Sequence, residues 1–215
     1  DIDNDGDLDI LSPSGFLVCT AIPFNPACGG IAWFEQTSDG WVRHTILENV
    51  QELFYHRAEV IDFDGDGLRD LIITGEQAAG FIGGANRAVA QWFKGTPSGD
   101  YFESEPRSMA DGLGSFPRVR DVDGDGDLDI ASAEYFHDGG SFAWLERLAE
   151  PSDAKPEGEF IRHVIADDVG PSIMFTFVPD FLGDGGLKAI GSNHTNTAKD
   201  DPDPWESGIY LFDIP

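Results

Sequence analysis

Short stretches of apolar, β-branched and aromatic residues recur along the whole chain, and Gly, Pro, Asp or Asn residues stand between them. Apolar and polar residues alternate in some of these stretches, as in residues 58–62, whereas residues 71–74 form a continuous apolar run. Alternation indicates a strand with one buried face, and a short apolar run indicates a strand buried on both faces. No stretch shows the period of about 3.6 residues that marks an amphipathic helix. The pattern predicts an all-β protein.

The strands belong to an internal repeat, which an acidic segment marks most clearly. This segment reads DIDNDGDLDI from Asp1, DFDGDGLRDL from Asp62, DVDGDGDLDI from Asp121 and a degraded DFLGDGGLKA from Asp180, so its copies start 61, 59 and 59 residues apart. A second landmark, IAWFE, AQWFK, FAWLE and IYLFD, recurs at residues 31–35, 90–94, 142–146 and 209–213. A third, WVRHTI and FIRHVI, follows at residues 41–46 and 160–165, with a divergent counterpart near residues 101–106. Three landmarks in one order at one period establish the repeat.

Each repeat contributes four strands, which we designate a, b, c and d in chain order. The acidic segment lies between a and b, and the second and third landmarks are c and d. Tandem four-stranded antiparallel units are the blades of a β-propeller, and a β-sandwich with chance repeats is the alternative. The chain reads b-c-d, a-b-c-d, a-b-c-d, a-b-c. It predicts one propeller domain or fragment over residues 1–215, with about four blades of about 60 residues: a partial blade 1 at 1–50, blade 2 at 51–110, blade 3 at 111–169 and a partial blade 4 at 170–215.

The first and last of these blades each lack one strand. Propellers have about 4–8 blades and close by pairing their two ends. The chain is therefore either a fragment of a larger wheel or a complete small wheel whose ends fall inside blades. We favour the fragment, and expect the missing strands to come from the rest of a longer chain, for instance a wheel of about seven blades, or from a second copy of the chain.

Three of the acidic segments carry the pattern D-x-D-x-D-G-x-x-D, with carboxylates at positions 1, 3, 5 and 9 and Gly at position 6. Carboxylates this close repel one another unless a cation lies between them, so a solvated acidic turn is the weaker alternative. So many protein oxygens suit Ca²⁺ better than Mg²⁺. The pattern predicts about three calcium sites. Their ligands would be Asp1, Asp3, Asp5 and Asp9; Asp62, Asp64, Asp66 and Asp70; and Asp121, Asp123, Asp125 and Asp129.

Two further observations define the kind and the number of the predicted metal sites. An EF-hand is excluded, because position 12 holds Ser12, Ile73 and Ser132 where that motif has a bidentate Glu. The fourth segment keeps Asp180 and Asp184 but has Leu182 and Lys188 at ligand positions. Lys188 supplies a positive charge in place of the ion, so we expect this loop to be free of metal.

The acidic pattern, followed by Leu or Ile and combined with a repeat of about 60 residues, resembles the FG-GAP/VCBS repeat of integrin α-subunit propellers and of many secreted bacterial and fungal proteins. The Gly-Ala-Pro part of the integrin signature is absent after Asp9, Asp70 and Asp129, which favours the broader VCBS-like group over integrin-type adhesion. The resemblance implies structural calcium, an extracellular setting and a binding role. It does not imply one chemistry, because the group includes lectins, adhesins, polysaccharide lyases and sugar dehydratases.

The charge and the cysteines indicate the partners and the compartment. The chain has 40 Asp and Glu against 13 Lys and Arg, a net charge of −27, which disfavours nucleic acid and anionic membrane surfaces as partners. Cys19 and Cys28 lie in the b–c connection of the first blade, either as a disulfide or as two reduced thiols; calcium loops suit an oxidising compartment and favour the disulfide. We expect an extracellular, secreted, periplasmic or cell-surface protein. Asn193 opens an N-glycosylation sequon.

The acidic segments lie at one end of the predicted sheets, and the b–c and d–a connections lie at the other. Aromatic and charged residues gather in those connections, a mixture that suits a sugar or uronate ligand unless the polar residues are merely solvated. The candidate ligand-binding residues are His56, Arg57, Glu76, Arg118, Glu134 and Tyr135, and the candidate catalytic residues are His56, Arg57, His137 and His194. His44, His163, Trp33, Trp92 and Trp144 recur with the repeat and are expected to be framework residues.

We interpret the chain as a calcium-stabilised extracellular propeller that binds a glycan or an extracellular protein. The alternative is an enzyme, a polysaccharide lyase or sugar dehydratase, acting at the end opposite the calcium loops. There a His would supply the base and an Arg would neutralise a carboxylate. A structural spacer is a third reading. The sequence contains no nucleophile elbow, P-loop, dinucleotide fingerprint or HExxH motif, so binding is favoured over catalysis.

Overall fold

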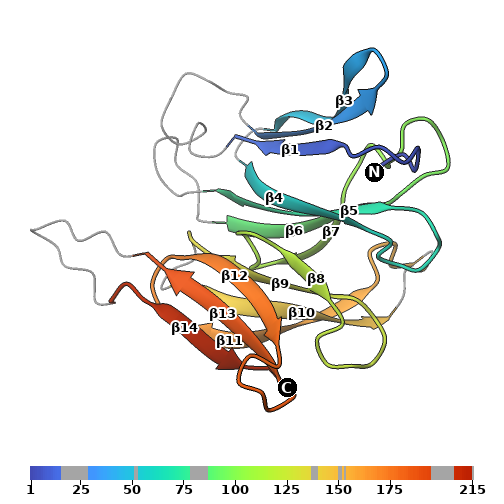
Figure 1. Ribbon diagram of the computed structural model, residues 1–215. Coiled ribbons are helices and arrows are strands. Elements are labelled where there is room, and N and C mark those ends of the chain that lie inside the picture. Colours follow the sequence, from blue (N-terminus) through green and yellow to red (C-terminus); the bar gives the residue numbers. More distant parts are fainter. Residues whose placement is uncertain are drawn as a thin grey trace, which may run out of the picture.

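The computed structural model describes residues 1–15, 29–50, 53–77, 87–136, 140–149, 152, 154–194 and 206–214, and every regular element within them is a β-strand (Figure 1). Sheet 1 contains β1 (Ile10–Ser14), β2 (Gly29–Thr37) and β3 (Gly40–Val50), and sheet 2 contains β4 (Phe54–Ile61), β5 (Asp70–Gln77), β6 (Arg87–Phe93) and β7 (Arg107–Asp111). Sheet 3 contains β8 (Arg118–Arg120), β9 (Asp129–Glu134), β10 (Ser141–Ala149) and β11 (Glu159–Asp167), and sheet 4 contains β12 (Ser172–Pro179), β13 (Leu187–Asn193) and β14 (Ile209–Asp213). No helix in this described part of the chain is long and apolar enough to cross a membrane.

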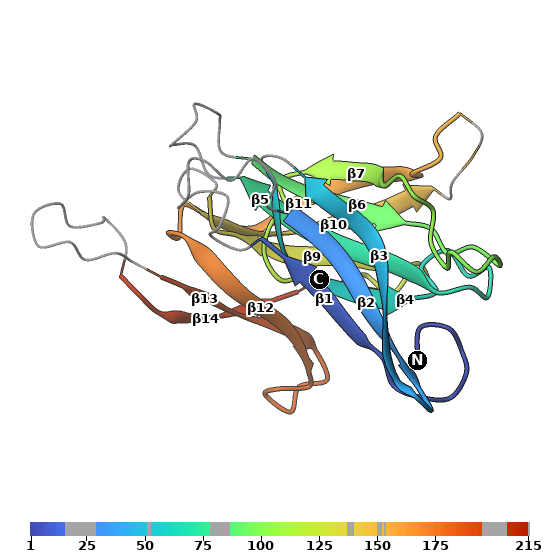
Figure 2. The same cartoon turned by 90° about the horizontal axis from the view of Figure 1, so that it is seen from above.

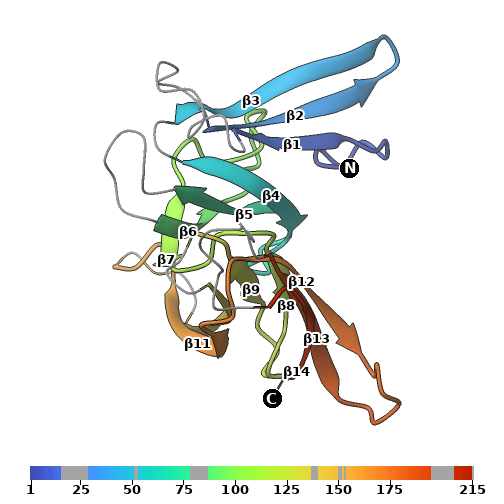
Figure 3. The same cartoon turned by 90° about the vertical axis from the view of Figure 1, so that its left-hand side faces the viewer.

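The strands of every sheet pair antiparallel in chain order, so neighbours in a sheet are also neighbours in the sequence. The sheets have three, four, four and three strands, which is the arrangement b-c-d, a-b-c-d, a-b-c-d, a-b-c. Figure 3 shows them following one another from β1–β3 at the top to β12–β14 at the bottom, and Figure 2 shows the arrangement from above. The predicted all-β class with propeller-like blades is confirmed.

The outer strand of sheet 2 lies further along the chain than the landmarks predict. β7 spans Arg107–Asp111, whereas the sequence places this strand near residues 101–106. The chain first folds back on the end of β6, where Phe102 forms an isolated bridge with Gly95. The β6–β7 ladder includes Arg107 and continues from there, so the extra turn displaces the strand.

The three interfaces between consecutive sheets each contain a hydrophobic core. The recurring tryptophans belong to them: Trp33 lies in the core between sheets 1 and 2, Trp92 in that between sheets 2 and 3, and Trp144 in that between sheets 3 and 4. Leu71 and Ile73 of β5 belong to the first core, and Ile72 between them belongs to the second. Successive residues of a strand point to opposite faces, so β5 is buried on both, as its continuous apolar run predicts.

The recurring histidines join strand c to strand d in sheets 1 and 3. The His44 ring stacks on Trp33 with the ring centroids 4.2 Å apart, and His163 stacks on Trp144 at 4.5 Å. His44 Nε2 also lies 2.7 Å from a carboxylate oxygen of Glu35, which stands two residues after the Trp. In sheet 2 an arginine takes this place, with the Arg107 guanidinium 4.8 Å from the Trp92 ring. The repeated Arg-His pattern is therefore a framework feature, as predicted.

Gly140, which precedes β10, marks a close approach between sheets 3 and 4. It has a φ of +68°, and a Cβ at this position would lie 1.8 Å from the carbonyl oxygen of Gly170. Gly170 lies just before β12, so the contact fixes where sheet 4 begins against sheet 3.

Gly140→Ala should destabilise the fold by about 2 kcal/mol or more, because the methyl group meets backbone and the φ is left-handed. Urea denaturation followed by tryptophan fluorescence measures this free energy of unfolding. The matched control is Gly99→Ala, since a Cβ at Gly99 meets nothing within 4 Å. We expect it to change stability by about 0.5 kcal/mol at most, and equal effects of the two variants would contradict the close approach.

Candidate metal loops and the pocket at the opposite end

The four acidic loops share part of their backbone conformation. Positions 4 and 6, counted from the first Asp, have a positive φ in every copy. Position 4 is Asn4, Gly65, Gly124 or Gly183, with φ between 64° and 84°, and position 6 is Gly6, Gly67, Gly126 or Gly185, with φ between 77° and 102°. A Cβ on these glycines would meet no atom within 4 Å, so the backbone angle, and not lack of space, explains the glycine. The fourth loop keeps these two angles although its ligand positions have changed, but it differs from the complete loops in the positive φ of Asp180, 51°.

The turn brings carboxylates together in the three complete loops. In each of the following sets, one oxygen per residue lies within 4.8 Å of the others: Asp1, Asp3 and Asp5; Asp62, Asp64 and Asp66; Asp121, Asp123 and Asp129. The Oδ1 atoms of Asp1, Asp62 and Asp64 are buried without a hydrogen-bond partner. Buried anionic oxygens are costly unless a donor or a cation satisfies them. A hard divalent cation such as Ca²⁺ fits this donor set.

The carboxylate at position 9 has a structural role that the motif alone does not reveal. In each complete loop one of its oxygens accepts the N–H of the residue after the first Asp, and the other accepts an N–H three residues after the recurring Trp of strand c. These two distances are 2.6 and 3.1 Å for Asp9, 2.9 and 2.6 Å for Asp70, and 2.9 and 2.9 Å for Asp129. Burial raises the pKa of Asp70, and that of Asp129 to about 6. Each carboxylate thus ties the start of its loop to strand c, and its predicted ligation of the metal remains a prediction.

Lys188 occupies position 9 of the fourth loop and makes different contacts. Its Nζ lies 2.9 Å from Asp184 Oδ2 in the loop and 2.6 Å from Asp213 Oδ1 at the end of β14. The backbone takes over the closing hydrogen bond, with the Asp180 N–H donating to the Gly186 carbonyl at 2.9 Å. This geometry supports the prediction of a metal-free fourth loop.

The second loop contains a cation that the sequence prediction overlooks. Lys94, the residue after β6, forms ion pairs with Asp64 and with Asp66, the latter at 2.6 Å. Burial by itself lowers the pKa of Lys94, but its hydrogen bonds to the two carboxylates outweigh burial and raise the pKa above its ordinary value. The hydrogen bond from Lys94 likewise lowers the pKa of Asp66.

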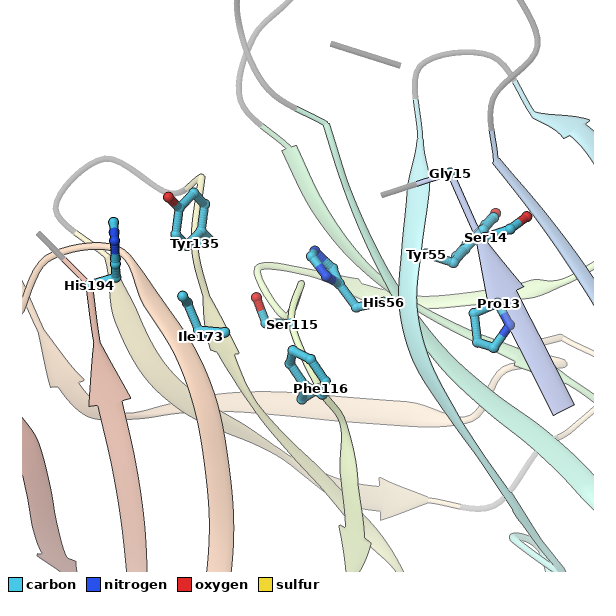
Figure 4. A pocket seen from close by; sticks show the side chains of 10 residues that line it. All are labelled: Pro13, Ser14, Gly15, Tyr55, His56, Ser115, Phe116, Tyr135, Ile173 and His194. Atoms are coloured by element: carbon cyan, nitrogen blue, oxygen red, sulfur yellow. The ribbon is translucent and has the colours of Figure 1, made fainter. Parts of the chain in front are cut away.

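A pocket of about 500 Å³ lies at the opposite end of the sheets, where β1, β5, β9 and β13 end or pass into loops (Figure 4). All four sheets contribute to it. The lining residues are Pro13, Ser14 and Gly15 from sheet 1, Tyr55 and His56 from sheet 2, Ser115, Phe116 and Tyr135 around sheet 3, and Ile173 and His194 from sheet 4. Figure 4 shows His56, Ser115 and Phe116 between Tyr55 on one side and Tyr135 and His194 on the other. The lining combines aromatic rings with a few hydroxyl and imidazole groups.

The buried carboxylate of Glu76 organises the floor of this pocket. One oxygen accepts the N–H of Tyr135 at 2.7 Å, and the other lies 2.8 Å from His56 Nε2 and 3.2 Å from Ser115 Oγ. Its side chain is 0% exposed and that of His56 is 6% exposed. A Cβ on Gly114 would lie 2.2 Å from the Glu76 side chain, so only glycine leaves room for it. Glu76 therefore positions residues of two sheets and does not itself face the pocket.

Glu134, the last residue of β9, forms a second buried polar cluster. Its carboxylate pairs with the Arg162 guanidinium at 3.0 Å and accepts a hydrogen bond from Ser141, while its Oε1 has no partner. Burial raises the pKa of Glu134 to about 7, and the Glu76 carboxylate adds to this effect, while Arg162 opposes it.

The remaining candidate residues lie away from the pocket or outside the described residues. Arg57 is 45% exposed and lies 3.7 Å from Glu59, and Arg118 pairs with the same carboxylate at 3.2 Å. Neither arginine lines the pocket, whereas the predicted residues His56, Tyr135 and His194 do. His137, Cys19 and Cys28 lie outside the described residues. The Asn193 side chain of the sequon is buried, and its amide binds the carbonyls of Val169 at 2.6 Å and Glu206 at 2.9 Å, so this amide is not a free glycosylation acceptor.

One signal in the sequence locates the pocket. Position 15 of the four repeats, counted as above, is Gly15, Glu76, Tyr135 and His194. Three of these residues line the pocket, and Glu76 lies beneath it. Because each b strand begins at its acidic loop and has a similar length, the same position of every repeat reaches the same end of the molecule.

Tandem antiparallel sheets, each with an acidic loop before its second strand, define a β-propeller-like repeat protein. Residues 62–132, from the second acidic loop into β9, match the family of the FG-GAP-like repeat. This match confirms the resemblance predicted from the acidic segments. The chain matches no curated protein and no solved structure.

Glu134 should make stability depend on pH in a specific direction. Its pKa rises from an ordinary 4.5 to about 7 in the folded protein, so the folded state holds a proton that the unfolded state releases between these values. The contribution of Glu134 to the free energy of unfolding is therefore fully present below about pH 4.5 and is lost as the pH rises to about 7. Glu134→Gln should therefore gain up to about 3 kcal/mol relative to the parent protein between pH 5 and pH 8, since one pKa unit corresponds to about 1.4 kcal/mol.

Urea denaturation at a series of pH values measures this difference. Glu105→Gln, at an exposed carboxylate, is the control and should leave the pH profile unchanged. Parallel profiles for Glu134→Gln and the parent protein would show that Glu134 does not hold the proton.

Proposed function

We propose that this chain is a calcium-stabilised, extracellular recognition module of the FG-GAP type that binds a glycan in the pocket opposite its acidic loops. The observation that carries the proposal is the convergence of all four sheets on one pocket of about 500 Å³, which position 15 lines in three repeats and supports from beneath, through Glu76, in the second. Protein sites for small ligands have volumes of about 300–1,000 Å³ and combine apolar walls with a few placed polar groups.

The ligand class follows from the groups that line the pocket. Phe116 and Tyr135 supply aromatic rings, which pack against the apolar faces of sugar rings. Ser14, Ser115 and His194 supply polar groups that can exchange hydrogen bonds with hydroxyl groups. None of the described lining residues is Lys or Arg. This composition favours a neutral glycan over the uronate that the lyase alternative requires, because the candidate arginines pair with Glu59 elsewhere.

Calcium supports the site from the other end of the same strands. β5 and β9 begin at position 9 of an acidic loop and run to the pocket, where β9 leads directly into Tyr135. A cation that neutralises the loop carboxylates would hold each a–b connection closed and fix the strands that follow it. An extracellular location supplies calcium at the concentrations that such loops require, which is why we place the protein there.

Removal of calcium should lower the melting temperature clearly. If a loop binds Ca²⁺ with a dissociation constant of roughly 10 µM, about 1 mM Ca²⁺ adds about 2.7 kcal/mol per occupied site. Scanning calorimetry in Ca²⁺, in excess EDTA and in Mg²⁺ measures the effect, and we expect Mg²⁺ to substitute poorly.

Variants of the third and fourth loops test whether the calcium effect comes from the complete loops. Asp123→Asn combined with Asp125→Asn should reduce the calcium-dependent shift, whereas Asp184→Asn in the fourth loop should preserve it. An identical melting curve in Ca²⁺ and EDTA would overturn calcium stabilisation.

Tyr135→Ala and Phe116→Ala should each abolish glycan binding. An array of neutral and acidic glycans identifies the glycans that the parent protein binds, and calorimetry measures their affinity for each variant. Both rings line the pocket, and their removal takes away the stacking surface. Arg57→Ala is the matched control, because Arg57 stands next to His56 in β4 but lies outside the pocket.

Equal loss of binding in all three variants would contradict the pocket as the glycan site. Binding of proteins but of no glycan would favour the protein-recognition reading. An unsaturated product released from uronate polymers by the parent protein, and lost in His56→Ala, would establish the lyase alternative instead.

A further inference from the structure

One position of the repeat distinguishes the second acidic loop from the first and third. The residue two places after the recurring Trp is Glu35 in sheet 1, Lys94 in sheet 2 and Glu146 in sheet 3. Glu35 and Glu146 accept hydrogen bonds from His44 and His163 of the neighbouring strand d. They bring no positive charge toward an acidic loop.

Lys94 points toward the acidic loop instead. Its ammonium group pairs with the carboxylates of Asp64 and Asp66, which occupy positions 3 and 5 of the loop. The Lys94 side chain is 22% exposed and that of Asp64 is 10% exposed, so this pair is largely shielded from water. Charge pairs in such surroundings are stronger than pairs on the open surface.

We propose that Lys94 is a built-in counter-ion of the second acidic loop and makes this loop a weaker calcium site than the first and third. The proposal rests on the calcium binding proposed above. Lys94 and Ca²⁺ compete for the same two carboxylates, those of Asp64 and Asp66. Calcium must therefore either displace the ammonium group and break its ion pairs, or bind beside its positive charge, and either requirement reduces its affinity.

The fourth loop shows how far this substitution can go. There Lys188 bridges Asp184 at position 5 and Asp213 of strand c, and the loop retains the positive φ at positions 4 and 6 with Leu182 in place of a carboxylate ligand. A lysine ammonium group is thus compatible with the folded loop without a full set of metal ligands. The second loop has both the complete set of carboxylates and a lysine.

The backbone amides of two glycines allow calcium binding to be followed separately in the second and the third loop. The N–H of Gly67 donates to Asp62 at 3.0 Å, and that of Gly126 donates to Asp121 at 3.2 Å, so each amide senses its own loop. A calcium titration of the metal-free protein followed by ¹⁵N–¹H correlation spectra gives a separate midpoint for each amide. We expect the Gly67 midpoint to lie about tenfold or more above that of Gly126, because a shielded pair of this kind is worth at least one factor of ten in affinity.

The variants isolate the charge of Lys94. Lys94→Met keeps an apolar stem and should lower the Gly67 midpoint about tenfold, to near that of Gly126, whereas Lys94→Arg should keep it high. Lys155→Met removes one positive charge from an exposed pair with Glu159, and should leave both midpoints unchanged.

The outcomes separate the inference from the proposed function. Coincident Gly67 and Gly126 midpoints in the parent protein, or a Gly67 midpoint that Lys94→Met does not move, would overturn the role of Lys94 while leaving calcium binding intact. If neither amide responds to calcium in any variant, the calcium sites themselves fail, and the inference fails with them.

Discussion

The buried carboxylate at position 9 of the acidic loops is the interaction on which the rest of each repeat depends. Burial of a carboxylate is expensive unless hydrogen-bond donors surround it, and Asp9, Asp70 and Asp129 each receive two backbone N–H groups. One donor lies at the start of the loop and the other near the end of strand c, so three parts of the chain meet at one side chain. This contact closes the a–b connection and holds the start of strand b beside the end of strand c.

The residue near the end of strand c decides how the charge of each blade is balanced. Where it is Glu35 or Glu146, it is hydrogen-bonded to a histidine that also stacks on the recurring tryptophan, so hydrogen bonding and packing together hold strand d. Where it is Lys94, the positive charge goes to the acidic loop, and the cation over Trp92 on strand d is an arginine. In a chain with 40 acidic and 13 basic residues, Lys94 and Lys188 each pair with two carboxylates. The repeat thus keeps its backbone while its electrostatics change from blade to blade.

Much of the fold was predictable because local sequence patterns mark the strands of each repeat. The acidic segment, the Trp-containing strand and the Arg-His strand give the order and number of strands, and positive φ at Gly6, Gly67 and Gly126 matches the turn that the motif predicts. The strand β7 was misplaced because its position depends on a fold-back at Phe102 that leaves no periodic signal. The roles of Glu76 and Lys94 could not be read from the sequence, since their partners stand 20 to 60 residues away and 28 to 30 residues away, respectively. Charged residues near a loop do not reveal which carboxylate they will contact.

The contrast between positions 9 and 15 explains where the functional residues lie. Position 9 is an aspartate in three repeats, because any other side chain would leave two backbone N–H groups unsatisfied, and the fourth repeat needs a lysine and a rearranged hydrogen bond to replace it. Position 15 lies at or just beyond the other end of the same strand, and its residue differs in every repeat. It is Gly15, Glu76, Tyr135 and His194, and these residues still meet: Glu76 binds the N–H of Tyr135, and the Tyr135 and His194 rings lie 6.5 Å apart. A repeated scaffold therefore brings four different residues to one end of the molecule, and chemical variety arises where the structural constraint ends.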